Sequence, residues 1–191
     1  MYEKMCEILK EKTIGDFAIH HFEIDEHDLY ARLHGIESGK YVKLTQNEEV
    51  VMSDTKMEKE TNAAFVRSAH GNVLVGGLGI GLIVLAIQDK EDVETITVLE
   101  KNKEVIDLVQ NQLPLNEKVR IVQDDVFTYT PQDKYNTIYL DVWNYINEDI
   151  YEHEMKPLMS KYRKHLVAKK DDPNRYIDCW CRLEAKNGIR I

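Results

Sequence analysis

Cysteine and proline are both scarce in this sequence of 191 residues. The three cysteines, Cys6, Cys179 and Cys181, cannot form a disulfide framework, because any pairing leaves one of them over. Cys179 and Cys181 also lack the second cysteine pair that a zinc site of this kind needs. With only four prolines and a hydrophobic share of 43%, the chain is neither disordered nor of low complexity. Free thiols are typical of a reducing compartment, and we expect a cytoplasmic protein.

Basic residues are in the minority, with 25 Lys and Arg against 34 Asp and Glu and a formal net charge of -9. A dedicated nucleic-acid binder normally carries a basic stripe, and we therefore expect no nucleic-acid surface. The stretch 68–88 has no formal charge and is long enough to cross a bilayer. Its polar start and the glycines in its middle favour a soluble strand, loop and helix, and we expect no contact with a membrane.

Metal-binding and nucleophile motifs are also lacking. The seven histidines are scattered without the spacing of metal ligands, and we expect no metal site. No nucleophile elbow, zinc-protease helix or Walker lysine is present.

Glycine, by contrast, is concentrated in one place. Of nine glycines, five fall within eleven residues: Gly71, Gly76, Gly77, Gly79 and Gly81. Glycine permits a sharp turn from strand to helix and lets a ligand lie against bare main chain, whose N–H groups bind carboxylates or phosphates. The spacing of Gly77, Gly79 and Gly81 is not that of the dinucleotide fingerprint. Tight packing between strand and helix is the alternative explanation of these glycines.

The first 54 residues form a strand-rich segment in this interpretation. A charged helix over 1–12 precedes strands at 17–24, 29–33, 41–45 and 50–52, with turns at Gly35, Gly39 and residues 46–47. A helix over 56–69 then begins with Thr55 and Glu58 at the spacing of a capping box. Its expected buried residues are Met57, Ala64, Phe65 and Ala69.

Residues 55–191 carry the alternating pattern of an α/β domain. Apolar strands are predicted at 73–75, 96–99, 119–122 and 137–140, with helices at 82–87 and 102–112. A helix over 151–166, divided by Pro157, and a last strand over 176–183 complete the chain. Short strands alternating with helices predict a mostly parallel, Rossmann-like sheet flanked by helices.

Ligands of such sheets bind outside the carboxyl ends of the strands, and two of the predicted strand ends suit a nucleoside. Glu100 follows the second strand, 19 residues beyond Gly81, where a carboxylate can accept from both hydroxyls of a ribose. Asp125 follows the third strand and can accept from an adenine amino group, while the backbone N–H of Val126 serves a ring nitrogen. A solvated strand end and a turn-forming aspartate are the respective alternatives.

The fourth strand ends at Asp141, which is expected to face the reacting end of the ligand. This carboxylate could orient a cationic sulfonium or an amine, or act as a general base. Trp143 and Tyr145 follow it and are expected on the substrate side, with packing in the core as the alternative for Trp143.

Together, residues 72–143 resemble a class I S-adenosylmethionine-dependent methyltransferase. The resemblance rests on V-L-V-G-G-L-G-I-G-L, I-T-V-L-E-K-N, V-R-I-V-Q-D-D-V-F and Y-N-T-I-Y-L-D-V-W. Within that superfamily the chain is most similar to the spermidine-synthase-like branch, including small methyltransferase-like proteins of phages and bacteria. The resemblance implies S-adenosylmethionine as cofactor, with Gly77, Gly79 and Gly81 against its amino-acid part.

Two departures argue against polyamine synthesis. Aminopropyltransferases carry an aspartate in the loop where this chain has Gly79, and a D-S-x-D-P stretch where this chain has D-V-W-N from Asp141. We therefore predict methyl transfer to a small acceptor. Aminopropyl or other non-methyl chemistry on the same ligand, and a non-catalytic binding or assembly module, are the alternatives. The strand-rich segment could also pair with a second copy of the chain. The short region after Asp141 predicts a shortened C-terminal sheet edge.

Overall fold

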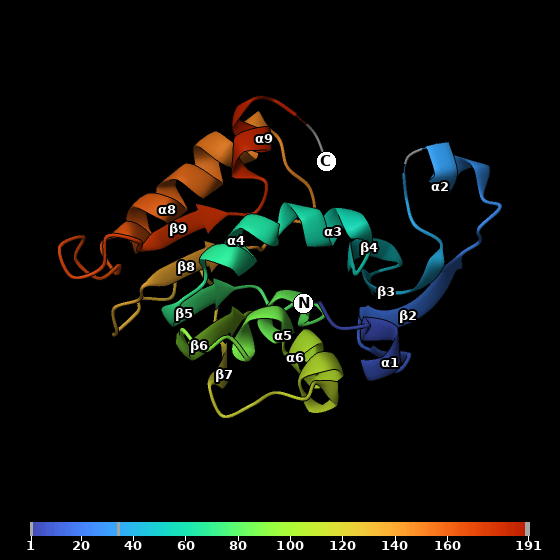
Figure 1. Cartoon of the computed structure of the whole chain (residues 1–191), viewed down its shortest axis with the longest axis horizontal. Coiled ribbons are helices and arrows are strands. Elements are labelled where there is room, and N and C mark those ends of the chain that lie inside the picture. Colours follow the sequence, from blue (N-terminus) through green and yellow to red (C-terminus); the bar gives the residue numbers. More distant parts are fainter. Residues whose placement is uncertain (1, 34, 190–191) are drawn as a thin grey trace.

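The computed structural model describes residues 2–33 and 35–189, which form two sheets with flanking helices (Figure 1). The first sheet is antiparallel, with strands in the order β1 (Lys12–Ile14), β2 (Phe17–Ile24), β3 (Gly39–Gln46) and β4 (Glu49–Ser53). The second sheet is parallel, in the order β7 (Val119–Gln123), β6 (Val93–Glu100), β5 (Gly71–Gly76), β8 (Thr137–Leu140) and β9 (Tyr176–Cys179). This arrangement confirms the predicted Rossmann-like α/β class.

The antiparallel sheet is built from consecutive hairpins. β2 and β3 pair along their full length, and β3 turns into β4 through Asn47 and Glu48, both at positive φ. The predicted helix over 1–12 is wrong in extent, because only α1 (Met5–Ile8) is helical and Lys12 already lies in β1. The predicted strand over 29–33 is also wrong, because this stretch is the helix α2 (Leu29–Leu33). The Asp28 carboxylate accepts from the N–H of Ala31, 3.0 Å away, and so caps α2.

The expected helix over 56–69 is divided in two at Asn62, giving α3 (Lys56–Thr61) and α4 (Ala63–Ser68). The capping box is absent, since Thr55 makes no side-chain cap and its hydroxyl lies 3.0 Å from that of Ser53. Phe65 and Ala69 are buried as predicted, but Met57 and Ala64 are exposed. The buried face follows helical spacing through Glu58, Asn62, Phe65 and Ala69, and so includes a carboxylate in place of a methionine.

The parallel sheet reverses its order beside β5, which lies between β6 and β8. β5 leads through the glycine loop into α5 (Leu82–Gln88), and β6 leads into α6 (Lys103–Val109), which η1 (Gln110–Gln112) extends as a 3₁₀ turn. The last four residues of β5 and all of β8 are buried, as expected for strands covered on both faces. A sheet with this order leaves a crevice at the carboxyl ends of β5 and β8, and that crevice positions the site described below.

The C-terminal helical region is divided near Pro157, as predicted. α7 (Glu148–Ile150) continues into η2 (Tyr151–Met155), a stretch of π-helix, and then into α8 (Lys156–Arg163). Proline lacks an N–H, and a π-helical stretch just before it accommodates the lost hydrogen bond. The strand predicted over 176–183 ends earlier, because Cys181 takes a left-handed conformation and α9 (Arg182–Lys186) follows. No helix in the described ranges is long and apolar enough to cross a membrane.

Candidate functional site

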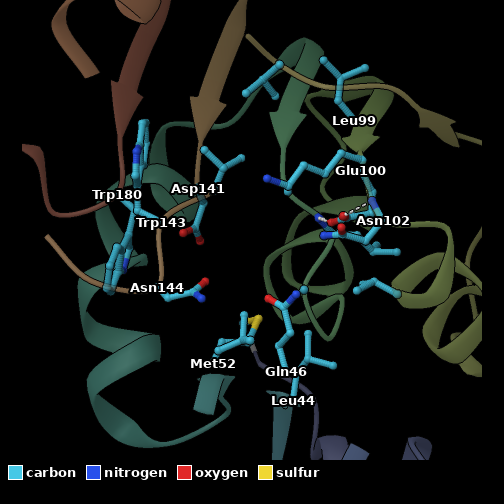
Figure 2. Close-up of a pocket in the computed structure, with 18 of the residues that line it drawn as sticks. Leu44, Gln46, Met52, Leu99, Glu100, Asn102, Asp141, Trp143, Asn144 and Trp180 are labelled. Carbon is cyan, nitrogen blue, oxygen red and sulfur yellow. Dashed lines mark hydrogen bonds between the residues drawn. The ribbon is translucent and has the colours of Figure 1, made fainter. Parts of the chain in front are cut away.

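A pocket of about 430 Å³ lies at the carboxyl ends of the central parallel strands. Figure 2 shows Glu100 and Asn102 on one side of it, Asp141, Trp143 and Trp180 on the other, and Leu44, Gln46 and Met52 of the antiparallel sheet at its base. The two sheets therefore share one cavity. Of the predicted site residues, eight line it: Gly77, Gly79, Glu100, Asp125, Val126, Asp141, Trp143 and Tyr145. Gly81 does not line the pocket.

The three loop glycines have intramolecular reasons to be glycine. All take positive φ: +97° at Gly77, +51° at Gly79 and +80° at Gly81. A Cβ atom on each would overlap, in that order, the backbone carbonyl of Asp141, the thioether of Met52 and the side chain of Leu113. The packing explanation therefore applies to all three positions. Their contact with a ligand stays a prediction.

Most N–H groups of the loop are already engaged. The N–H of Gly77 donates to Leu99, that of Leu78 to Glu100, and that of Gly81 to the carbonyl of Leu78. The N–H of Ile80 points at the sulfur of Met52, 3.3 Å away. We find no partner for the N–H of Gly79 within the described ranges. The loop thus offers a ligand one free donor and one that is held only by a weak sulfur acceptor.

Met52 was not among the predicted site residues. It enters the loop from β4, and only the packing of the antiparallel sheet against the parallel one brings it there. No local pattern in the sequence could have indicated this contact.

Glu100 is held rigidly at the end of β6. Its side chain is buried, and its two oxygens accept from the N–H groups of Leu78 at 3.1 Å and Asn102 at 2.8 Å. A carboxylate oxygen has two acceptor positions, so each oxygen can take one further hydroxyl. This geometry fits the two vicinal hydroxyls of a ribose, and the predicted role of Glu100 stays a prediction.

Asp125 lies in the turn after β7. One of its carboxylate oxygens accepts from the N–H of Phe127 at 2.8 Å, so the turn-forming role of this aspartate is real. Its other oxygen has no partner among the described residues, and neither does the N–H of the adjacent Val126. The carbonyl of Val126 is fixed by the hydroxyl of Tyr162 at 2.9 Å. An acceptor next to a donor is the pair that an aminopurine edge requires.

Asp141 follows β8, and its N–H donates to the carbonyl of Gly76 at 2.8 Å. Desolvation raises the pKa of its carboxyl well above the ordinary value, and the nearby charge of Glu58 raises it further. Glu58 lines the same pocket from α3, and burial raises its pKa to about 7. Sequence reasoning placed Glu58 only in a helix cap. Its spacing of four from Asn62, on the face that holds Phe65, was the signal that it would be buried.

Three aromatic residues line the side of the pocket near Asp141. Trp143 is almost buried and its indole N–H donates to Glu154 at 2.7 Å, so it belongs both to the core and to the pocket wall. Tyr145 is 61% exposed at the pocket mouth. Trp180, which sequence reasoning missed, is buried and donates to the hydroxyl of Thr61 at 3.1 Å. Within the described ranges, no group of three or more His, Cys, Asp or Glu could hold a metal ion.

Comparisons with known proteins give similar structures only. No protein-family model matches the chain, and no curated protein matches it. One similar structure is DhpI with S-adenosylhomocysteine (SAH), at 17% identity and a TM-score of 0.48 over 64% of this chain and 55% of that one. A second is the N-methyltransferase NodS from Bradyrhizobium japonicum WM9 with SAH, at 16% identity and a TM-score of 0.46 over 60% and 59%. The glycopeptide N-methyltransferase MtfA follows at 20% identity and a TM-score of 0.43 over 57% and 48%.

The matched part is about half of the DhpI and MtfA chains. None of these three structures is described as a spermidine synthase, and the resemblance to that branch stays a prediction.

Proposed function

We propose that this chain binds S-adenosylmethionine in the pocket and transfers its methyl group to a small acceptor. The observation that supports this most is the convergence of four strand ends on one cavity. The loop after β5, Glu100 after β6, Asp125 after β7 and Asp141 after β8 all line it. A nucleoside with an amino-acid arm and a cationic centre needs this set of partners in this order.

Each part of the pocket has a task in this proposal. Glu100 holds the ribose hydroxyls, Asp125 and the N–H of Val126 hold the adenine edge, and the N–H of Gly79 faces the amino-acid part. Asp141 lies beside the sulfonium. When bound, S-adenosylmethionine supplies a methyl group on a good leaving group, so the protein has mainly to place the acceptor in line with it. Met52 and Gln46 line the same pocket from the antiparallel sheet.

Titration calorimetry with S-adenosylmethionine and SAH tests the ribose assignment. Glu100→Gln removes the charge but keeps one acceptor, and charge-assisted hydrogen bonds contribute about 1.5–3 kcal/mol. We therefore expect an affinity loss of about tenfold or more. Glu94→Gln, at the exposed start of the same strand, is the matched control and should bind as the parent does.

Melting temperatures of both variants without ligand will show whether Glu100→Gln disturbs the loop that it anchors. Unchanged affinity in Glu100→Gln would refute the ribose assignment. If neither S-adenosylmethionine nor SAH raises the melting temperature of the parent, the non-catalytic alternative is favoured, since a ligand stabilises the protein that binds it.

Aminopropyl transfer is a second candidate because of Glu58. The motifs of this chain depart from those of aminopropyltransferases at Gly79 and after Asp141, yet the buried carboxylate of Glu58 lines the pocket from α3. Incubation with S-adenosylmethionine or its decarboxylated form, each with and without putrescine, separates the two reactions. Mass spectrometry of the products distinguishes SAH from methylthioadenosine.

A further inference from the structure

The pocket wall near Asp141 is rich in carboxylates and indole rings. Glu58 from α3, Asp141 after β8 and Glu154 from η2 all line it, together with Trp143 and Trp180. Glu58 is 6% exposed, and Glu154 accepts the indole N–H of Trp143. Asp141, Trp143 and Trp180 lie on the side of the pocket opposite Glu100 (Figure 2), and the indole of Trp143 holds Glu154 to that side. They are therefore placed to meet the acceptor and the reacting centre, away from the proposed ribose site.

Within the described residues, no ion pair joins the carboxyl groups of this wall to a cationic side chain. Among the described ion pairs, neither Glu58 nor Asp141 has a cationic partner, and the nearby Lys59 is directed to Asp54 at 4.0 Å. A backbone hydrogen bond from Ser53 lowers the pKa of Glu58, but burial outweighs it. Burial drives both carboxyl groups toward their neutral forms, and a cation bound between them would stabilise the charged forms instead. The positive charge of a sulfonium can balance one of these two carboxylates, and the other is left without a cationic partner.

We infer that the acceptor carries a basic amine, which binds as an ammonium between Glu58 and the indole rings of Trp143 and Trp180. This inference rests on the proposed methyl transfer and specifies its acceptor. The face of an indole ring attracts a cation, and a carboxylate forms a charge-assisted hydrogen bond to it. Both kinds of group are present on the same wall.

The Glu58 carboxylate also has a place for the proton that the reaction releases. The ammonium passes one proton to Glu58, which frees the nitrogen lone pair. That pair forms the new N–C bond to the methyl carbon, while the S–C bond breaks and its electron pair stays on sulfur. The products are a methylated ammonium, a neutral thioether and protonated Glu58. Burial brings the pKa of Glu58 to about 7, which suits a group that gains and loses a proton near neutrality.

Binding of paired probes to the SAH-saturated protein tests this inference. The pairs are 2-phenylethylamine with 2-phenylethanol, and n-butylamine with 1-butanol, which differ only in the amine. We expect each amine to bind the parent at least about tenfold more tightly than its alcohol, by calorimetry. Glu58→Gln should remove most of that preference, and Glu58→Asp should keep part of it. Glu60→Gln, on the exposed side of the same helix, is the matched control.

The first titration, with SAH alone, separates the two proposals. If SAH does not bind, the proposed function fails. Equal binding of SAH to the parent and to Glu58→Gln would show that the cofactor site is intact in both. If the alcohols then bind as tightly as the amines, or if no amine binds, the acceptor inference is overturned while the proposed function stands. An amine preference that Glu58→Gln leaves intact overturns the role of Glu58. Incubation with labelled S-adenosylmethionine then reports whether the methyl group is recovered on the amine nitrogen.

Discussion

Replacing Gly77 by alanine separates the two reasons why the loop contains glycine. Gly77 has a φ of +97°, and a Cβ there would overlap the backbone carbonyl of Asp141. Gly35 has a φ of +65°, and no atom of the described residues lies within 4 Å of the position its Cβ would take. Gly35→Ala therefore measures conformational strain alone, whereas Gly77→Ala adds a steric overlap with main chain that cannot rotate away.

The expected magnitudes follow from these two environments. A left-handed conformation costs an alanine about 1–2 kcal/mol, and the smaller entropy of the unfolded alanine chain returns about 0.4–1 kcal/mol. Gly35→Ala should therefore lower the free energy of unfolding by about 1 kcal/mol. Overpacking adds about 1–3 kcal/mol, so Gly77→Ala should lower it by about 2–4 kcal/mol. The loss in the free energy of unfolding for Gly81→Ala should lie between these two values, because the Cβ there would meet the flexible side chain of Leu113.

Urea unfolding, followed by the fluorescence of the two tryptophans, measures these changes. Gly79→Ala provides an internal check, because its obstacle is the side chain of Met52. Met52→Ala in the Gly79→Ala background should recover part of the lost stability, whereas it should recover none in the Gly77→Ala background. If Gly77→Ala is no more destabilising than Gly35→Ala, the loop has room that the structure does not show, and the packing argument is wrong.

Two further predictions concern groups outside the pocket. The ammonium of Lys90 donates to the carbonyls of Val66, Arg67 and Ala69 at the end of α4, so Lys90→Met should destabilise the chain by about 1–2 kcal/mol in urea. The exposed Lys103→Met should stay within about 0.5 kcal/mol of the parent, and an equal loss in both would contradict the capping role. Burial lowers the pKa of His70, but its contacts with the Ser68 carbonyl and Asp172 outweigh this and raise it overall. The stability that His70 adds, relative to His70→Gln, should therefore be complete below about pH 6.5 and decline as the pH rises through its folded pKa. A stability difference that is constant with pH would refute this.

Much of the parallel sheet could be read from the sequence because its signals are local. The strand over 137–140 matches β8, and the predicted strands at 73–75, 96–99 and 119–122 lie within the observed ones. Fully buried parallel strands are continuous apolar runs, which need no knowledge of their neighbours. The polar residues that end these strands can also be recognised from the local sequence alone. Glu100, Asp125 and Asp141 line one pocket because the carboxyl ends of parallel strands share one edge.

The errors occurred where a local pattern has more than one solution. Residues 29–33 contain enough apolar residues for a strand, but the Asp28 cap makes them a helix. Residues 56–69 allow more than one helical face to be buried, and contact with the parallel sheet selected the face that includes Glu58 rather than Met57. Short elements of this kind take their conformation from tertiary packing more than from their own propensity.

The sequence by itself therefore determined the fold class, the place of the glycine loop and the acids at the strand ends. Periodicity and strand boundaries are properties of neighbouring residues, and they are visible without the fold. Only the tertiary structure decided what surrounds those acids. It brought Met52 onto the loop from β4, Glu58 to the side of Asp141 from α3, and Trp180 from beyond β9. These contacts join residues far apart in the chain, and only the packing of the two sheets and their helices fixes them.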